Sequence, residues 1–212
     1  MGRDKALIEI DGVPMVRRVA VALREAGART VIAVGGDAPR LAEALAGLDV
    51  RLVPDDTPGA GPLAGLLTAL GNLPAFGPDP TGTGDPGASA AAPAGTGEPD
   101  AGTGIALVVS CDLLAPSARS MAATVDALAR RDVDTHATVP RAEGHPQWLH
   151  AAWRHSAASP LRHEHDRGER SIRRAVAAAA LSVEWIDDLD TATLADADTP
   201  KDLRNPPVGH GH

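Results

Sequence analysis

Three charged residues stand at positions where they could bind one phosphate-bearing ligand. Lys5 lies in a charged opening stretch, whereas Asp55 and Asp112 each follow a short apolar run. A lysine ammonium neutralises phosphate oxygens, and a carboxylate at the end of a buried strand suits a hard cation such as Mg²⁺. The residue types therefore indicate a site for an anionic ligand and its counter-ion.

These residues also have ordinary structural interpretations. A lysine in a charged loop is commonly solvated. An aspartate after a strand commonly caps the helix that follows it, and for Asp112 the two interpretations are equally consistent with the sequence.

A cluster of glycines follows Asp55. Gly59, Gly61 and Gly65 surround Pro62-Leu63-Ala64 and place flexible backbone and a predicted helix start close to Asp55. This arrangement suits a ring or a phosphate that approaches the main chain. A plain turn before a helix explains the same glycines.

Two further carboxylates, Asp196 and Asp198, are separated by one residue and lie just before Pro200. Alternate residues of an extended chain face the same side, so these two side chains can share a divalent ion. Helix capping is the alternative explanation of Asp198.

Two other groups are weaker candidates. His145 lies in a turn and is an acid or base by residue type, although a turn histidine is usually solvated. The cations of residues 169–174 lie beside a predicted helix start and could attract an anion, but a charged helix face is the simpler reading. Cys111 is the only cysteine, which excludes a cysteine-built zinc site.

The elements that must position these residues alternate along the chain. Apolar spacing predicts helices at 13–26, 39–48, 61–70, 116–130 and 171–181. Apolar runs predict strands at 7–10, 30–34, 50–53, 105–110, 137–140, 148–153 and 182–186. The alternation predicts an α/β fold, a three-layer Rossmann-like, mostly parallel sheet with helices on both faces. In such sheets ligands bind beyond the carboxyl ends of the strands.

We predict one domain over residues 1–204 and a flexible tail over 205–212. Residues 74–104 interrupt the pattern, because eight of these 31 residues are glycine, six are proline and none is lysine or arginine. This composition predicts a disordered insertion, with a functional lid as the alternative.

Charge and hydropathy exclude several classes of partner. The net charge of -8 and the isoelectric point near 5.4 leave no basic stripe for nucleic acid. The longest apolar run, 175–181, is far shorter than the roughly 20 residues that span a bilayer. Charges rather than a signal-peptide stretch follow Met1. We therefore expect a cytoplasmic protein without nucleic acid or membrane partners; the sequence indicates no oligomeric state.

Several short blocks, taken in order and together, resemble the molybdenum cofactor guanylyltransferase family. The resemblance spans nearly the whole chain outside residues 74–104, and neighbouring sugar-nucleotide and cytidylyl transferases share the first block and the Asp112 block. The blocks are Met1-Gly2-Arg3-Asp4-Lys5, Val53-Pro54-Asp55, Gly61-Pro62-Leu63-Ala64-Gly65, Cys111-Asp112, His145-Pro146, Gly168-Glu169-Arg170-Ser171 and Asp198-Thr199-Pro200.

The resemblance implies a nucleotide-diphospho-sugar-transferase-like fold and a Mg²⁺-dependent enzyme. Such an enzyme transfers GMP from GTP to the terminal phosphate of molybdopterin and releases pyrophosphate. By position, Lys5 would contact the triphosphate, Asp55 would help to read guanine, and Gly61 would bring main chain to the nucleotide. Asp112 would hold the magnesium ion, and Asp198 would add a metal or cofactor contact.

The chain departs from the family at both ends. The family often has asparagines where this chain has Asp196 and Asp198, and it has a first strand and a Leu-Ala-Gly-Gly loop before the block that corresponds to Met1-Gly2. We therefore expect that the natural start lies upstream, and that the chain as given turns over GTP weakly or not at all. The alternatives are a cytidylyl or sugar-phosphate nucleotidyltransferase, or a noncatalytic truncated remnant.

Overall fold

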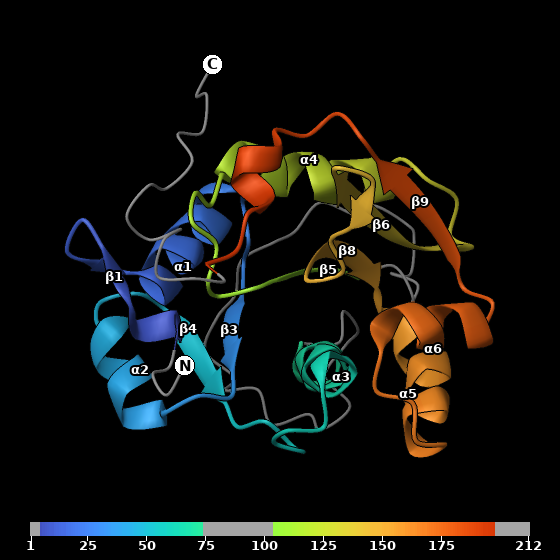
Figure 1. Ribbon diagram of the computed structural model, residues 1–212, viewed down its shortest axis with the longest axis horizontal. Coiled ribbons are helices and arrows are strands. Elements are labelled where there is room, and N and C mark those ends of the chain that lie inside the picture. Colours follow the sequence, from blue (N-terminus) through green and yellow to red (C-terminus); the bar gives the residue numbers. More distant parts are fainter. Residues whose placement is uncertain (1–4, 74–103, 198–212) are drawn as a thin grey trace, which may run out of the picture.

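The computed structural model describes residues 5–73 and 104–197, in which strands and helices alternate (Figure 1). The strands are β1 (Glu9–Ile10), β2 (Val13–Pro14), β3 (Val31–Val34), β4 (Val50–Val53), β5 (Ile105–Val109), β6 (Thr135–Ala142), β7 (His145–Pro146), β8 (His150–Arg154) and β9 (Ser182–Ile186). The α-helices are α1 (Met15–Glu25), α2 (Ala38–Ala44), α3 (Pro62–Asn72), α4 (Ala118–Ala129), α5 (Ala158–Asp166) and α6 (Ile172–Ala178). Short 3₁₀ turns are η1 (Lys5–Leu7), η2 (His155–Ala157) and η3 (Thr191–Leu194).

Local sequence signals explain where several helices begin and end. The Asp37 carboxylate caps α2 by accepting the Arg40 amide hydrogen bond at 3.2 Å. The Ser117 hydroxyl caps α4 in the same way. After α1, the chain turns at Gly27 with a φ of +96°, a conformation that glycine adopts without a steric penalty.

The strands form two main sheets whose connections agree with the predicted α/β class. β3 and β4 pair in parallel, with Val31 opposite Val50 and Val34 opposite Val53. The second sheet has the order β5-β8-β6-β7, and β9 pairs with β6. β8 is antiparallel to β5 and β6, while β9 is parallel to β6, so β5, β6 and β9 run in one direction. Three of the four longer strands of this sheet therefore share one direction, and β3 and β4 are parallel to each other, which confirms the predicted fold class.

Helices cover both faces of the second sheet and give the predicted three layers. In Figure 1, α4 lies above β5, β8 and β6, whereas α3, α5 and α6 lie below them. The core on the lower face surrounds the fully buried Trp153 of β8 and includes Leu63, Leu66 and Leu70 of α3. Because β5 and β8 lie inside these layers, the residues that follow β5 are held on a rigid scaffold.

The two main sheets are not joined in the part of the chain that the structure describes. β3 is bonded only to β4, and β5 only to β8, so β3 and β5 each keep one free edge among these residues. α5 is a helix that the sequence did not predict. The predicted insertion over 74–104, apart from Gly104, and the predicted tail over 205–212 lie outside the described residues. No helix within the described ranges has the length and apolar character to cross a membrane.

Candidate active site

Lys5 and Asp112 lie together, although 106 residues separate them in the sequence. The Lys5 Nζ atom is 3.2 Å from Asp112 Oδ2, and the two side chains are 32% and 14% exposed. η1 carries Lys5, and Asp112 follows the carboxyl end of β5. The pair places a cation and a partly shielded carboxylate where open α/β sheets bind ligands.

Ser110 and residues 195–197 fix the position of Asp112. The Ser110 hydroxyl donates a hydrogen bond to Asp112 Oδ1. The Asp112 carbonyl accepts the Ala197 amide at 2.9 Å, and Leu113 forms a bridge with Asp196. The structure thus brings Asp196 beside the Asp112 segment, whereas Asp198 lies outside the described residues.

Asp55 lines a second hollow, beyond the carboxyl ends of β3 and β4. This pocket has a volume of about 390 Å³ and is lined by Gly35, Gly36, Pro54, Asp55 and Gly59, among others. Asp55 Oδ1 accepts the Thr57 amide at 3.0 Å, which orients the carboxylate within its turn. The pocket volume is within the range of small-molecule sites, roughly 300–1,000 Å³.

A larger cavity lies next to the Asp55 pocket. It has a volume of about 820 Å³ and is lined at one end by Gly35 and Gly36, which also line the Asp55 pocket. Ser110 and Cys111, which directly precede Asp112, line the same cavity. Asp55 thus lines the smaller pocket, whereas the two residues before Asp112 line the larger cavity, which shares Gly35 and Gly36 with that pocket.

Gly61 has a structural requirement that the sequence did not reveal. It is the residue before α3 and has φ +88° and ψ 178°, a combination that only glycine adopts readily. A Cβ added at Gly61 would lie 3.2 Å from the Arg170 carbonyl oxygen. That carbonyl accepts the Leu63 amide at 3.3 Å. The close approach of Arg170 explains the glycine without a ligand, so a nucleotide contact at Gly61 stays a prediction.

The structure supports the plain interpretation of the cation cluster at 169–174. The Glu169 carboxylate accepts the amides of Arg170 and Ser171, each at 2.7 Å, and pairs with the Arg174 guanidinium. The Arg174 hydrogen bond, followed by those amides, lowers the pKa of Glu169 to about 2. Arg174 of this cluster is thus already paired with a carboxylate. His145 is exposed at the start of β7 and stays a surface residue.

The residues present around Asp112 fit a magnesium ion that is completed by substrate. Mg²⁺ is usually bound by one or two carboxylates and by phosphate oxygens rather than by an all-protein cage. Asp112 supplies one such carboxylate. Among the described residues no three histidine, cysteine or acidic side chains gather as a possible all-protein metal site.

Sequence reasoning missed two polar residues of this region. Ser110 lies two positions before Asp112, and its position at a strand end next to an aspartate was the available signal. Asp56 accepts the Thr68 hydroxyl at 3.4 Å and ties the Asp55 turn to α3. That contact joins residues 12 positions apart and has no local signature.

Comparisons with curated proteins identify similar sequences. A probable molybdenum cofactor guanylyltransferase of Chloroflexus aggregans is 29% identical over 219 residues, which cover 96% of this chain and 85% of the relative. A probable molybdenum cofactor guanylyltransferase of Pelotomaculum thermopropionicum is 41% identical over 70 residues, 33% of this chain. That match covers about a third (32%) of the length of the Pelotomaculum protein.

Solved structures share the fold. A nucleotidyl transferase from Methanothermobacter thermautotrophicus superposes with a TM-score of 0.66 at 20% identity, covering 95% of this chain and 83% of that one. The molybdopterin-guanine dinucleotide biosynthesis protein A of Archaeoglobus fulgidus has a TM-score of 0.62 at 18% identity, covering 96% and 88%. A 2-C-methyl-D-erythritol 4-phosphate cytidylyltransferase from Thermus thermophilus has a TM-score of 0.61 at 15% identity, covering 95% and 91%.

A family model gives the assignment directly. The model described as the MobA-like NTP transferase domain matches residues 1–183, most of the chain. The match includes Lys5, Asp55, Gly61 and Asp112. Together with the sheet and the Lys5–Asp112 pair, it shows that this chain belongs to the MobA-like NTP transferase family.

Proposed function

We propose that this chain transfers GMP from GTP to the terminal phosphate of molybdopterin and releases pyrophosphate. Family membership supports nucleotidyl transfer in general, and the relatives named molybdenum cofactor guanylyltransferase support this donor and acceptor. The observation that carries the proposal is the Lys5–Asp112 pair, whose aspartate directly follows Ser110 and Cys111 in the wall of the larger cavity. Such a reaction takes place in the cytoplasm, where nucleoside triphosphates are available.

The chemistry needs charge neutralisation and alignment more than a strong base. An oxygen of the acceptor phosphate attacks the α-phosphorus of GTP. The bond from that phosphorus to the bridging oxygen breaks, and pyrophosphate leaves with the bonding electrons. Because the attacking oxygen is already anionic, no proton has to be removed from it. Lys5, with a third of its side chain exposed, can place its ammonium against the triphosphate.

Asp112 is proposed to bind a divalent metal ion. Ser110 contacts one oxygen of the carboxylate and Lys5 contacts the other, so the side chain is held in place. Bound there, Mg²⁺ would neutralise triphosphate oxygens and the leaving pyrophosphate. Asp198 is proposed as a further contact to the metal or to the acceptor.

The Asp55 pocket is proposed as the nucleobase site. Guanine presents a ring N–H and an adjacent amino group as two parallel donors, and a carboxylate is the acceptor that matches both. Cytosine presents a bare ring nitrogen at the corresponding edge, which a carboxylate repels. Gly61 and the start of α3 are proposed to lie against the nucleotide.

A transfer assay tests the proposal. The chain as given and a version extended before Met1 by a strand and a Leu-Ala-Gly-Gly loop of the kind that the resemblance implies, called the extended protein below, are incubated with Mg²⁺, molybdopterin and one nucleoside triphosphate. We expect pyrophosphate release with GTP in the extended protein and little in the chain as given. Consumption of CTP without GTP would support the cytidylyl alternative. The family match does not favour the noncatalytic remnant.

A further inference from the structure

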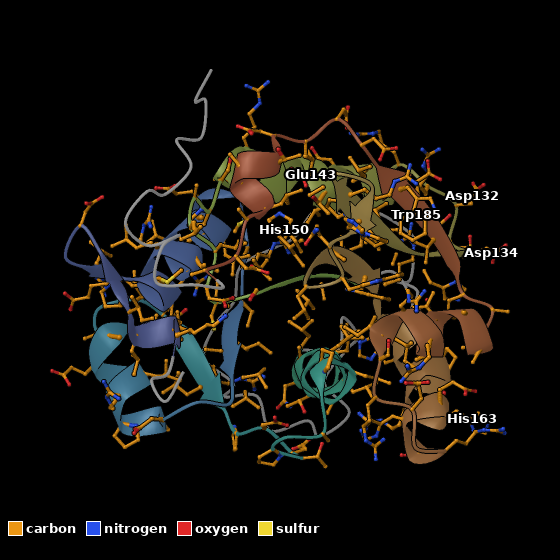
Figure 2. All side chains as sticks on the ribbon, viewed as in Figure 1. Asp132, Asp134, Glu143, His150, His163 and Trp185 are labelled. Carbon is orange, nitrogen blue, oxygen red and sulfur yellow. The ribbon has the colours of Figure 1, made fainter. Side chains whose placement is uncertain are left out.

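The three tryptophans of the chain form one cluster that reaches from the core to the surface. The Trp148 and Trp153 rings are stacked with centroids 6.2 Å apart, and the Trp148 and Trp185 rings meet edge to face with centroids 5.7 Å apart. Trp153 is fully buried, whereas Trp185 is 40% exposed. Figure 2 shows Trp185 on β9, beside β6. Trp185 is therefore the outer member of the cluster.

Core packing explains Trp153 but does not explain an indole at position 185. The chain has one phenylalanine and no tyrosine, so aromatic rings are scarce and aliphatic side chains fill most of its core. An indole that is 40% exposed leaves apolar area in contact with water, where it gains little for folding. Large rigid aromatic faces of this kind are enriched at binding surfaces.

An ion pair holds a second flat group beside Trp185. The guanidinium carbon of Arg141 is 5.6 Å from the centroid of the Trp185 ring, a cation–π distance. Arg141 Nε donates to Asp187 Oδ1 at 2.7 Å, and a second guanidinium nitrogen donates to the other carboxylate oxygen. These hydrogen bonds fix the plane of the guanidinium and lower the pKa of Asp187, so the pair stays charged at neutral pH.

The strand register places Trp185 near the same end of the sheet as Asp112. The pairings align one residue from each of four strands in a row across the sheet: Leu107, Ala152, Thr138 and Glu184. β5 and β9 run in one direction, so Trp185 lies one residue beyond this row toward the carboxyl ends, and Ser110 lies three residues beyond it. Because neighbouring strands are about 4.8 Å apart, β9 lies about 14 Å from β5.

These groups suit a flat ring with polar atoms at its edge. Aromatic rings stack on indole and on guanidinium planes. An ionised carboxylate offers about four lone-pair sites, and Arg141 uses one on each oxygen of Asp187, so the same carboxylate can accept from further N–H groups. A pterin fits this description, because it is a flat bicyclic ring with an amino group next to a ring N–H.

We propose that Trp185 and the Arg141–Asp187 pair bind the pterin ring of the acceptor by stacking. The identity of this ligand rests on the proposed function, whereas the stacking site rests on the ring and ion-pair geometry. With the ring at Trp185, the phosphate arm extends across the ends of β6 and β8 toward Asp112. The family match ends at residue 183, so Trp185 and Asp187 lie outside it.

Titration with a free pterin tests the stacking site without nucleotide or transfer. The probe is 6-hydroxymethylpterin, which has the ring and lacks the phosphate. The three tryptophans give three indole N–H signals in a ¹H–¹⁵N spectrum, and Trp185→Leu identifies the signal of Trp185. We expect this signal to shift because a stacked ring adds its ring current, while the signal of the buried Trp153 stays. A ligand of this size should saturate the site at about millimolar concentration.

Two arginines form a matched pair of variants. Arg141 pairs with Asp187 just after β9, and Arg131 pairs with Glu184 within β9. Successive strand residues face opposite sides, so Glu184 and Arg131 lie on the other face from Trp185. Trp185→Leu should weaken pterin binding about tenfold and Arg141→Leu about threefold or more, whereas Arg131→Leu should leave it unchanged.

Steady-state transfer in the extended protein tests whether the ring belongs to the acceptor. Trp185→Leu should raise the KM for molybdopterin about tenfold, because the stacking surface is lost. The KM for GTP and the kcat at saturating molybdopterin should stay largely unchanged, since Trp185 does not touch the reacting phosphates. A merely structural role would not select one substrate. Arg131→Leu is the control and should change none of these constants.

The outcomes separate this site from the proposed reaction. The stacking site is wrong if the pterin leaves the Trp185 signal unmoved at about millimolar concentration, or if Arg141→Leu and Arg131→Leu bind it equally. It is also wrong if GMP shifts that signal as strongly, because the site would then take a nucleobase. An unchanged KM for molybdopterin in Trp185→Leu would contradict the acceptor assignment. Absence of any transfer from GTP would contradict the proposed function, while the titration would still decide the stacking site.

Discussion

Lys5 and Asp112 contribute more to chemistry than to stability on physical grounds. Their ion pair is partly exposed, with side chains 32% and 14% accessible, and pairs of that kind stabilise proteins by about 0–1 kcal/mol. Ser110 and the Ala197 amide hold the Asp112 segment as well. Loss of the Asp112 charge should therefore injure a reaction while leaving the fold largely intact.

Asp112→Asn tests that expectation. In the extended protein we expect GMP transfer to fall by about 100-fold or more, because a charge that stabilises the reacting phosphates is lost while the side-chain shape is kept. The thermal midpoint should move by only a few degrees. Asp134→Asn, at an exposed aspartate just before β6, is the control and should change neither quantity. If Asp112→Asn transfers GMP as fast as the unaltered protein, Asp112 has a structural role and not a catalytic one.

The burial of His150 predicts how the free energy of unfolding depends on pH. It is 1% exposed, and neither ring nitrogen has a hydrogen-bond partner among the described residues. Burial lowers the pKa of His150 from 6.5 to about 4. Between these two values the unfolded chain binds a proton that the folded chain does not. The free energy of unfolding should therefore decrease as pH falls from about 6.5 to about 4, by about 3 kcal/mol from this residue.

Urea unfolding at pH 7.5, 6.5, 5.5 and 4.5 measures this effect. His150→Leu should flatten the decrease, whatever its own stability at pH 7.5. His163→Leu is the matched control, because His163 points outward from α5 in Figure 2 and is exposed. Equal slopes for His150→Leu and the unaltered chain would contradict the buried neutral histidine.

At the scale of elements, the sequence predicted those whose signals are local. The bounds of β4 and β9 agree with the predicted 50–53 and 182–186, because each is an apolar run between turn residues. The helix at 61–70 and the strand at 105–110 differ from α3 and β5 by one or two residues at their ends. α5 was missed because Leu161 is its only buried residue, which leaves no apolar period to detect.

The glycines at the start of α3 give a prediction at this scale. Gly61→Ala should destabilise the protein by about 1–3 kcal/mol, since its backbone is in a glycine-only region and a Cβ would press on Arg170. Gly65→Ala, four residues later inside the helix and with open space at its Cβ, should stabilise it by up to about 1 kcal/mol. Thermal unfolding of both variants measures these changes in stability. If Gly61→Ala is as stable as the unaltered protein, the close approach of Arg170 does not explain the glycine at position 61.

At the scale of the whole molecule, the site depends on contacts that no local pattern contains. The sequence placed Asp55 and Asp112 at the carboxyl ends of strands and Lys5 in a charged loop, and the structure has both aspartates within three residues of the ends of β4 and β5. It did not predict that Lys5 pairs with Asp112 or that Ser110 donates a hydrogen bond to the Asp112 carboxylate. These features depend on how distant segments pack, whereas hydrophobic periodicity reports only on each segment alone.

Product analysis of the nucleotidyl transfer itself tests the central claim most directly. The extended protein is incubated with Mg²⁺, molybdopterin and either GTP or CTP, and pyrophosphate and the nucleotide-linked pterin are quantified together. We predict equal amounts of pyrophosphate and guanylylated molybdopterin with GTP, little product with CTP, and loss of both in Asp112→Asn. Transfer from CTP in preference to GTP, or no transfer from either, would contradict the account.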